Sequence, residues 1–239
     1  MRLTNSPILV LAIAGCAAGC SGASESALAR GQALFASPSL STASANTFAC
    51  ATCHATSAAP DPSRRLAGYT LYDAAARPSW WGGKESTLLA AVNECLTAFE
   101  RGAPLAPDDA DGRALLVYLE SLAPDPSAPA LPLTAVGAID AAYEAKLAGG
   151  DPTRGAATYA AACAGCHGAI HTGAGRLDPG EPILPDATIA AHGASGAAPY
   201  VVEKVRHGGF FGVGGVMPPY SLQALPDPDL ADLLASLGL

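Results

Sequence analysis

Apolar residues recur at helical spacing in two well-separated stretches of the chain. The first stretch runs from Asp108 to Leu122, and the second begins with Asp227 as a helix cap and Pro228 in the first turn. Their apolar stripes are Leu115, Leu116, Leu119 and Leu122 in the first stretch, and Leu230, Leu233, Leu234 and Leu237 in the second. Residues three and four apart share one face of a helix, so each stretch predicts an amphipathic helix packed on a core.

An alanine-rich helix is predicted upstream of each amphipathic helix. The first spans Ser24 to Ala36, and the second starts at Asp151 and Pro152, a favourable cap and first-turn pair. Each contains a glycine with an aromatic residue four positions later on the same face, namely Gly31 with Phe35 and Gly155 with Tyr159. The pattern indicates two copies of one unit, in which the glycine-bearing helix packs against the amphipathic last helix.

A proline-rich segment separates the two copies. Its sequence, APDPSAPALPLTAV, contains four prolines, which predicts a stiff and extended linker. We assign the linker to residues 124–136, between a first domain at 24–123 and a second domain at 137–239. Half of the residues are apolar but only 6% are aromatic. Because alanine supplies much of the apolar total, close-packed helices and an all-α fold are favoured over a sheet.

Four of the seven cysteines stand in two C-x-x-C-H strings, one in each copy. These strings are Cys50, Cys53 and His54 in CATCH, and Cys163, Cys166 and His167 in CAGCH. The spacing is typical of c-type haem attachment, in which both thiols form thioethers to the porphyrin and the histidine becomes an axial ligand of the iron. Two strings in matching contexts predict two covalently attached haems.

The strings and their flanking helices resemble the class I cytochrome c family in duplicate, over nearly the whole chain after its first residues. The resemblance implies two tandem cytochrome c-like domains, an all-α fold and single-electron transfer. It also implies that the ring of each axial histidine donates a hydrogen bond to a backbone carbonyl. For His54 we expect this carbonyl near Pro60 to Pro62, and for His167 near Pro179 to Pro185.

Methionine occurs only at positions 1 and 217. Met217 lies in GGVMPP, just before the last helix, and this segment resembles the Met-Pro loop of the family. The resemblance implies that Met217 is the second axial ligand of the second haem. The alternatives are a methionine that only packs in a loop, or ligation by His171, His192 or His207.

The first domain has neither methionine nor a further histidine between His54 and the linker. Its candidate ligand is Cys95, in the segment VNECLTAFERGAPL, which resembles the cysteine-ligated haem domain of diheme thiosulfate dehydrogenases. That resemblance implies a thiolate-bound iron of low reduction potential. The alternative is a free cysteine on an amphipathic helix whose other apolar members are Leu88, Leu89, Val92, Leu96 and Phe99.

The N-terminal residues 1–20 are typical of an export signal. Arg2 precedes an apolar run from Pro7 to Gly15 that is too short to cross a membrane as a mature helix. Cys16 follows Ile13-Ala14-Gly15 in a sequence that resembles a bacterial lipobox, and Cys20 is a weaker second candidate for lipidation. We therefore expect a periplasmic protein held on a membrane by a lipid, with ordinary cleavage after a small residue as the alternative.

The formal net charge of −8 disfavours nucleic acid as a partner and favours redox proteins with a basic docking face. The leading function is transfer of single electrons through the two haems. A second hypothesis is an enzyme that oxidises a sulfur compound such as thiosulfate, with Cys95 as the residue at the catalytic haem; the absence of a basic residue at Ala90 and Ala91 counts against it. A third leaves the first iron open to peroxide or a diatomic gas.

Overall fold

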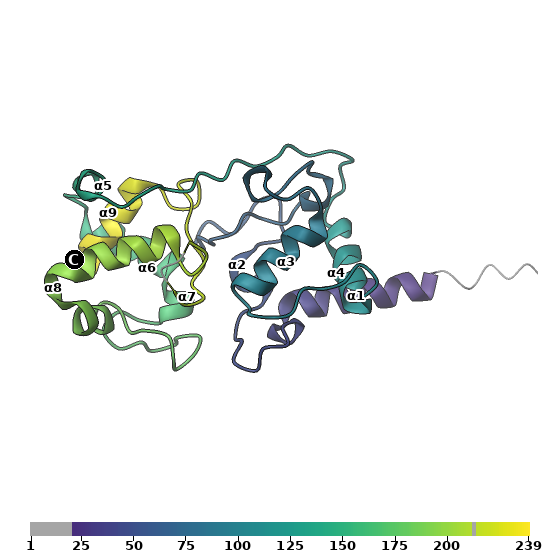
Figure 1. Cartoon of the computed structure of the whole chain (residues 1–239), viewed down its shortest axis with the longest axis horizontal. Helices are drawn as coiled ribbons and strands as arrows, with labels where there is room; N and C mark the ends of the chain where they lie inside the picture. The colour runs from purple at the N-terminus through teal and green to yellow at the C-terminus, as the bar shows by residue number, and fades with distance from the viewer. Residues whose placement is uncertain (1–20, 212–213) are drawn as a thin grey trace, which may run out of the picture.

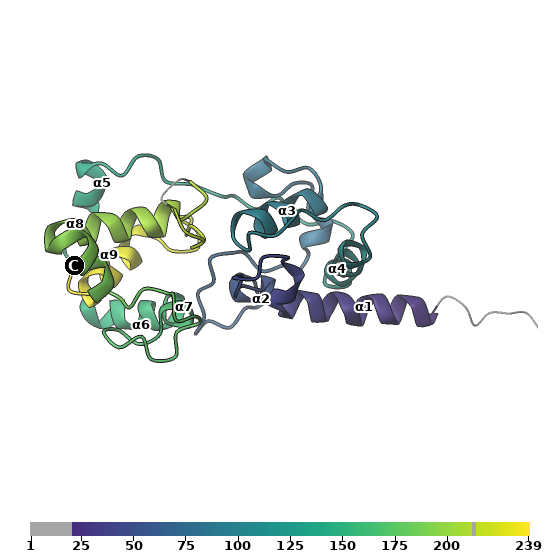
Figure 2. The same cartoon turned by 60° about the horizontal axis from the view of Figure 1, so that its bottom comes forward.

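The computed structural model describes residues 21–211 and 214–239, and their regular structure is helical, which confirms the predicted all-α class. The chain forms two lobes (Figures 1 and 2). The first lobe contains α1 (Ser21–Ala36), α2 (Cys50–Cys53), α3 (Leu88–Ala98) and α4 (Ala110–Ser121), with short 3₁₀ turns at Pro38–Leu40, Ala74–Ala76 and Trp81–Gly83. The second lobe contains α5 (Ala141–Lys146), α6 (Pro152–Ala162), α7 (Ala164–His167), α8 (Asp186–His207) and α9 (Asp227–Ser236).

The predicted packing of a glycine-bearing helix on an amphipathic helix is confirmed in both lobes. A Cβ atom at Gly31 of α1 would lie 2.0 Å from the carbonyl oxygen of Ala114 in α4. A Cβ atom at Gly155 of α6 would lie 1.8 Å from the carbonyl oxygen of Asp232 in α9. Both distances are far below van der Waals contact, so only glycine allows the two backbones to approach this closely.

The start of α9 differs by one residue from the prediction. Pro226 is the cap, and Asp227 is already the first helical residue. The carbonyl oxygen of Pro226 accepts the backbone N–H of Leu230, while the Asp227 carboxylate accepts hydrogen bonds from Tyr143 and from Arg206. The aspartate is thus used in a tertiary contact and does not cap the helix.

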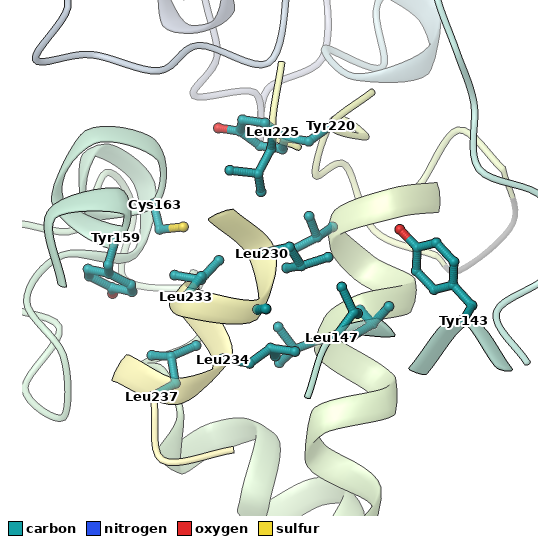
Figure 3. Packing of buried hydrophobic residues seen from close by; sticks show 14 residues of the cluster. Tyr143, Leu147, Tyr159, Cys163, Tyr220, Leu225, Leu230, Leu233, Leu234 and Leu237 are labelled. Carbon is teal, nitrogen blue, oxygen red and sulfur yellow. The ribbon is translucent and has the colours of Figure 1, made fainter. Parts of the chain in front are cut away.

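Each lobe has its own apolar core. The core of the first lobe is formed by Phe35, Leu40, Leu96, Leu115, Tyr118 and Leu119. The second core is larger (Figure 3), and its main members are Tyr143, Tyr159, Cys163, Val202, Tyr220, Leu225, Leu230, Leu233 and Leu237. Most of the predicted stripe leucines are therefore buried, although Leu116 and Leu122 stay partly exposed.

The chain between α4 and α5 contains no helix and is bound to both lobes. In the first lobe, the backbone N–H of Ala128 donates to the carbonyl of Ala76. In the second lobe, Thr134 exchanges hydrogen bonds with Gln223. The linker is thus fixed along the molecule (Figure 1). No helix within the described residues is both long and apolar enough to span a membrane.

Candidate functional site

Each C-x-x-C-H string forms a single helical turn. In the first lobe the turn is α2, and the backbone N–H of His54 donates to the carbonyl of Cys50 at 2.9 Å. In the second lobe the turn is α7, and the N–H of His167 donates to the carbonyl of Cys163 at 2.9 Å. Residues three apart in such a turn lie on one side of it, so the two thiols of each string lie side by side next to the imidazole.

Both imidazole rings are oriented by a backbone carbonyl fifteen residues further along the chain. Nδ1 of His54 donates to the carbonyl oxygen of Tyr69 at 2.7 Å, and Nδ1 of His167 donates to that of Pro182 at 3.0 Å. The prediction for His167 is confirmed. For His54 the predicted region, Pro60 to Pro62, is wrong. With Nδ1 occupied, Nε2 of each ring is left as the nitrogen that can bind a metal.

Gly68 explains why Tyr69 supplies the carbonyl for His54. A Cβ atom at Gly68 would lie 2.2 Å from Cε1 of the His54 ring, so the ring packs directly on the glycine backbone. The N–H of Gly68 also donates to the carbonyl of Cys53 at 3.0 Å. Pro60 to Pro62 lie on an exposed loop instead. A glycine close to a histidine in space carries no sequence signal when thirteen residues separate them.

A cavity of about 390 Å³ opens beside the first string. Cys50, Cys53 and His54 lie on its wall, and so does Cys95 of α3. The rest of the wall is mainly apolar, with Phe35, Leu40, Leu71, Leu88, Val92, Leu96, Leu115 and Leu119 among its members. An apolar chamber with two adjacent thiols, an oriented imidazole and a further sulfur has the donor set that a c-type haem requires.

The attachment cysteines are free thiols. Burial raises the pKa of Cys50 and of Cys53 to about 12, and that of Cys163 also to about 12. These three thiols are therefore neutral at physiological pH, and no disulfide joins any of the cysteines within the described residues. This is the form that adds to a vinyl group to make a thioether, so the residues present fit a covalently bound haem.

Cys95, the predicted ligand in the first lobe, lies on the same cavity wall as the first string. It lies on α3, whose N-terminus is capped by the Thr87 hydroxyl, and its burial raises the pKa of the thiol above the usual range. Forty residues separate Cys95 from His54, the end of the first string. The fold nevertheless brings it to the cavity that His54 lines.

Met217 packs against the second core, the cluster that contains Cys163. Its three histidine rivals are engaged elsewhere. Both ring nitrogens of His207 are hydrogen-bonded, one to Glu203 and the other to linker carbonyls. His171 is exposed and bound to Asp186, and His192 is exposed and stacked on Tyr200.

Glu100 is a buried acid that the sequence did not single out. It lines the first cavity and is only 5% exposed, and its Oε2 atom has no hydrogen-bond partner among the residues that the structure describes. Burial raises the pKa of this carboxyl to about 7. An unpaired acid in an apolar wall is a local departure from the rule that buried polar groups are satisfied.

The cations on the cavity wall are engaged within the protein. Arg77 donates to the carbonyls of Thr70 and Tyr72. Lys84 donates to Glu94 at 2.6 Å. Arg206 is buried and donates to Tyr143, to Asp227 and to two backbone carbonyls. Among the described lining residues, each cation is thus held by a protein acceptor.

Comparison with known proteins identifies the second lobe. Residues 150–235 match the family described as cytochrome c oxidase, cbb3-type, subunit III. The matched range holds α6, the CAGCH string and Met217. No curated protein matches the chain.

When bound, a c-type haem supplies an iron that gains or loses one electron. In the second lobe, Cys163 and Cys166 would be the thiols that hold such a haem, and His167 would be the imidazole. Residues 150–235 thus resemble a cytochrome c domain, and this match supports a c-type cytochrome with covalently bound haem and a role in haem-based electron transfer.

Proposed function

We propose that this protein is an exported diheme cytochrome c that carries single electrons between redox partners. One haem is attached at Cys50, Cys53 and His54, and the other at Cys163, Cys166 and His167. The observation that carries the proposal is the repeated arrangement in the two lobes. In both, the axial histidine donates to a carbonyl fifteen residues downstream, and a glycine helix packs on the closing helix. The first lobe thus has the same histidine contact and the same helix packing as the lobe that matches the cytochrome c family.

The axial pairs in this proposal are His54 with Cys95 and His167 with Met217. Cys95 is supported by its position on the wall of the cavity that His54 lines. Met217 is supported by its contact with the Cys163 cluster and by the engagement of the rival histidines. A thioether ligand raises the potential of haem iron and a thiolate lowers it, so the second haem is the easier to reduce.

The location and the partners belong to the same proposal. Cys16 or Cys20 would carry a lipid that holds the protein on a membrane facing the periplasm, and both residues lie outside the described part of the chain. The net charge of −8 favours redox partners with a basic docking face and disfavours nucleic acid. Such docking would weaken as salt rises, because exposed charges are screened.

Haem stoichiometry tests the proposal most directly. Protein matured in a host with haem-attachment machinery should keep the mass of two haems after denaturation, because thioether bonds survive unfolding. The double variant C50A/C53A should lose one haem, and C163A/C166A should lose the other. A wild-type mass that corresponds to a single haem would overturn the diheme proposal and leave only the second lobe as a haem domain.

The axial ligands are tested by a pair of substitutions. Met217→Ala should abolish the far-red sulfur-to-iron absorbance and lower one midpoint potential by some tenths of a volt, within the range of about 0.8 V that axial ligation covers. Cys95→Ala should instead remove a thiolate-type low-spin signal from the paramagnetic resonance spectrum. If the Met217→Ala spectrum and potential equal those of wild type, Met217 is not a ligand; an unchanged Cys95→Ala spectrum excludes Cys95 in the same way.

A second candidate is a dehydrogenase that oxidises a sulfur compound such as thiosulfate at the first haem. Cys95 in the cavity wall favours it, because this ligand is what the resemblance to thiosulfate dehydrogenases implies. Electron transfer without a substrate is favoured by the cations of the cavity wall, because a dianionic substrate needs a free cation near the iron. Arg77, Lys84 and Arg206 each donate to an acceptor of the protein. Turnover of thiosulfate with an artificial acceptor, lost in Cys95→Ala, would establish the enzyme; no turnover leaves the carrier.

A further inference from the structure

The two haem-attachment strings approach one another across the boundary between the lobes. The segment Arg65–Ala67 of the first lobe lies against the second lobe, where the N–H of Arg65 donates to the carbonyl of Ala161 at 2.9 Å. Ala161 lies two residues before Cys163. Ala67, in turn, packs on the second core and also lines the first cavity. The same short segment therefore contacts both haem regions.

Few bonds separate the two strings along this route. The N–H of Gly68 donates to the carbonyl of Cys53, and three residues earlier Arg65 donates to Ala161. The route from Cys53 to Cys163 thus consists of two short stretches of backbone joined through two hydrogen bonds.

Tyr220 secures this contact from the second lobe. Its hydroxyl donates to the carbonyl of Ala162 at 2.8 Å and lies 3.4 Å from the carbonyl of Arg65, so it bridges both lobes. The side chain is only 8% exposed, at the edge of the second core that faces the first lobe (Figure 3). Tyr220 also follows Met217 by three residues, and its backbone N–H donates to Val205 of α8 at 2.7 Å.

We propose that Tyr220 is a positioning residue for internal electron exchange, which holds the two haem sites in a fixed contact through the Arg65–Gly68 segment. The proposal rests on the proposed function, because it requires a haem at both strings. In the exchange, one iron loses an electron and the other gains it, and no bond or proton changes place. A hydroxyl that bridges carbonyls from both lobes is suited to this role, because it fixes their relative position without carrying charge.

Two further contacts join the lobes. Phe210 of the second lobe stacks on Trp81 of the first, with ring centroids 5.1 Å apart and planes inclined by 11°. The Arg65 side chain also pairs with Asp229. Loss of the Tyr220 hydroxyl should therefore loosen the contact between the haem sites while the lobes stay together.

The experiment is flash reduction of the full-length protein with both haems in place. After less than one electron per molecule is delivered, the spectra of the two haems should relax toward equilibrium at a rate that does not depend on protein concentration. Tyr220→Phe, which removes only the hydroxyl, should slow this relaxation several-fold, because a looser contact lengthens the path between the two sites. Pulsed paramagnetic resonance of the oxidised protein should show a broader distribution of iron-to-iron distances in this variant.

Tyr159→Phe is the matched control. Its side chain is also buried, near CAGCH, and its hydroxyl donates to the carbonyl of Gly168 at 2.8 Å, but this bond lies wholly within the second lobe. This variant should relax at the wild-type rate. Equal slowing in both variants, or no slowing in Tyr220→Phe, would overturn the role of Tyr220.

A measurement on the unaltered protein keeps the proposal testable if Tyr220→Phe does not mature. Relaxation whose rate rises in proportion to protein concentration would show exchange between molecules and would overturn the internal route. The haem count separates this result from failure of the proposed function. Protein with two haems and no internal exchange contradicts only the inference, whereas protein with one haem contradicts the diheme function itself.

Discussion

The two lobes orient their axial histidines in the same way and differ in what surrounds the site. In the second lobe the candidate sixth ligand, Met217, comes from the loop between α8 and α9. In the first lobe the candidate, Cys95, comes from the helix α3. The candidate sulfur is thus a thioether on a loop in one lobe and a thiol on a helix in the other. The rest of the arrangement is shared: a histidine bonded to a carbonyl, and a glycine-bearing helix packed on the last helix of the lobe. The shared helix packing therefore fixes the position of the histidine in each lobe, while the candidate ligand opposite it comes from a different element in each.

Buried charge also distinguishes the lobes. In the second lobe Arg206 is 1% exposed, and each of its three side-chain nitrogens donates to an oxygen. The buried Asp232 of α9 accepts from Arg154, and this hydrogen bond lowers the pKa of the carboxyl. In the first lobe Glu100 has an oxygen with no partner. The second lobe therefore has a satisfied polar network, whereas the first retains an unsatisfied acid beside its cavity.

Substitutions at the glycine contacts between α1 and α4 and between α6 and α9 should destabilise the protein most. Gly31→Val and Gly155→Val each insert a side chain where even a Cβ atom would meet backbone at 2.0 and 1.8 Å. Because a backbone carbonyl cannot rotate away, we expect each variant to lose about 5 kcal/mol, enough to unfold its own lobe. Gly137→Ala is the control, since its Cβ would meet nothing within 4 Å. Haem content per lobe and thermal unfolding measure the effect, and equal loss of both haems in either variant would show that the lobes do not fold separately.

The next largest loss of stability is expected from the hydrogen-bond network of Arg206 in the second lobe. Arg206→Met would leave the Asp227 carboxylate with only the Tyr143 hydroxyl as donor and would remove the donor to that hydroxyl and to two carbonyls, at a cost of about 3 to 5 kcal/mol. The matched change in the first lobe is Arg30→Met, which breaks an exposed pair with Asp111 and should cost less than about 1 kcal/mol. Denaturant unfolding of both variants checks the contrast. Similar losses in the two would mean that burial of Arg206 is not what makes its network important.

Glu100 gives the smallest expected effect, and it depends on pH. Its carboxyl has a pKa of about 7 in the fold against 4.5 ordinarily. At low pH the group is neutral in both states and costs nothing. As pH rises from 4.5 through 7, the unfolded chain ionises first, so the folded state loses roughly 2 to 3 kcal/mol of relative stability. Glu100→Gln should remove that decline in unfolding measurements across this range.

The exposed Glu120 on α4 provides the control for Glu100. Glu120→Gln should keep the wild-type dependence of stability on pH. If Glu100→Gln declines with pH as steeply as wild type, then Glu100 is not the acid responsible, and the contrast with the satisfied network of the second lobe would lose its main support.

The sequence by itself determined the frame of this protein. The two C-x-x-C-H strings, the glycines of α1 and α6, and the leucine stripes of α4 and α9 are all readable because their spacing follows the helical repeat. These features depend on residues close together in the chain, where local geometry decides what can meet. The carbonyl partner of His167 was instead expected from the family resemblance, between Pro179 and Pro185, and the structure has it at Pro182.

Only the tertiary structure decided which distant segments meet. It assigned the His54 partner to Tyr69, brought Cys95 to the wall of the first cavity, left Glu100 without a partner, and joined the lobes through Tyr220 and Arg65. Tyr220 and Arg65 are 155 residues apart, and their contact depends on how two finished cores dock. Such docking depends on the shapes of packed surfaces, which the spacing of residues along one chain does not encode locally.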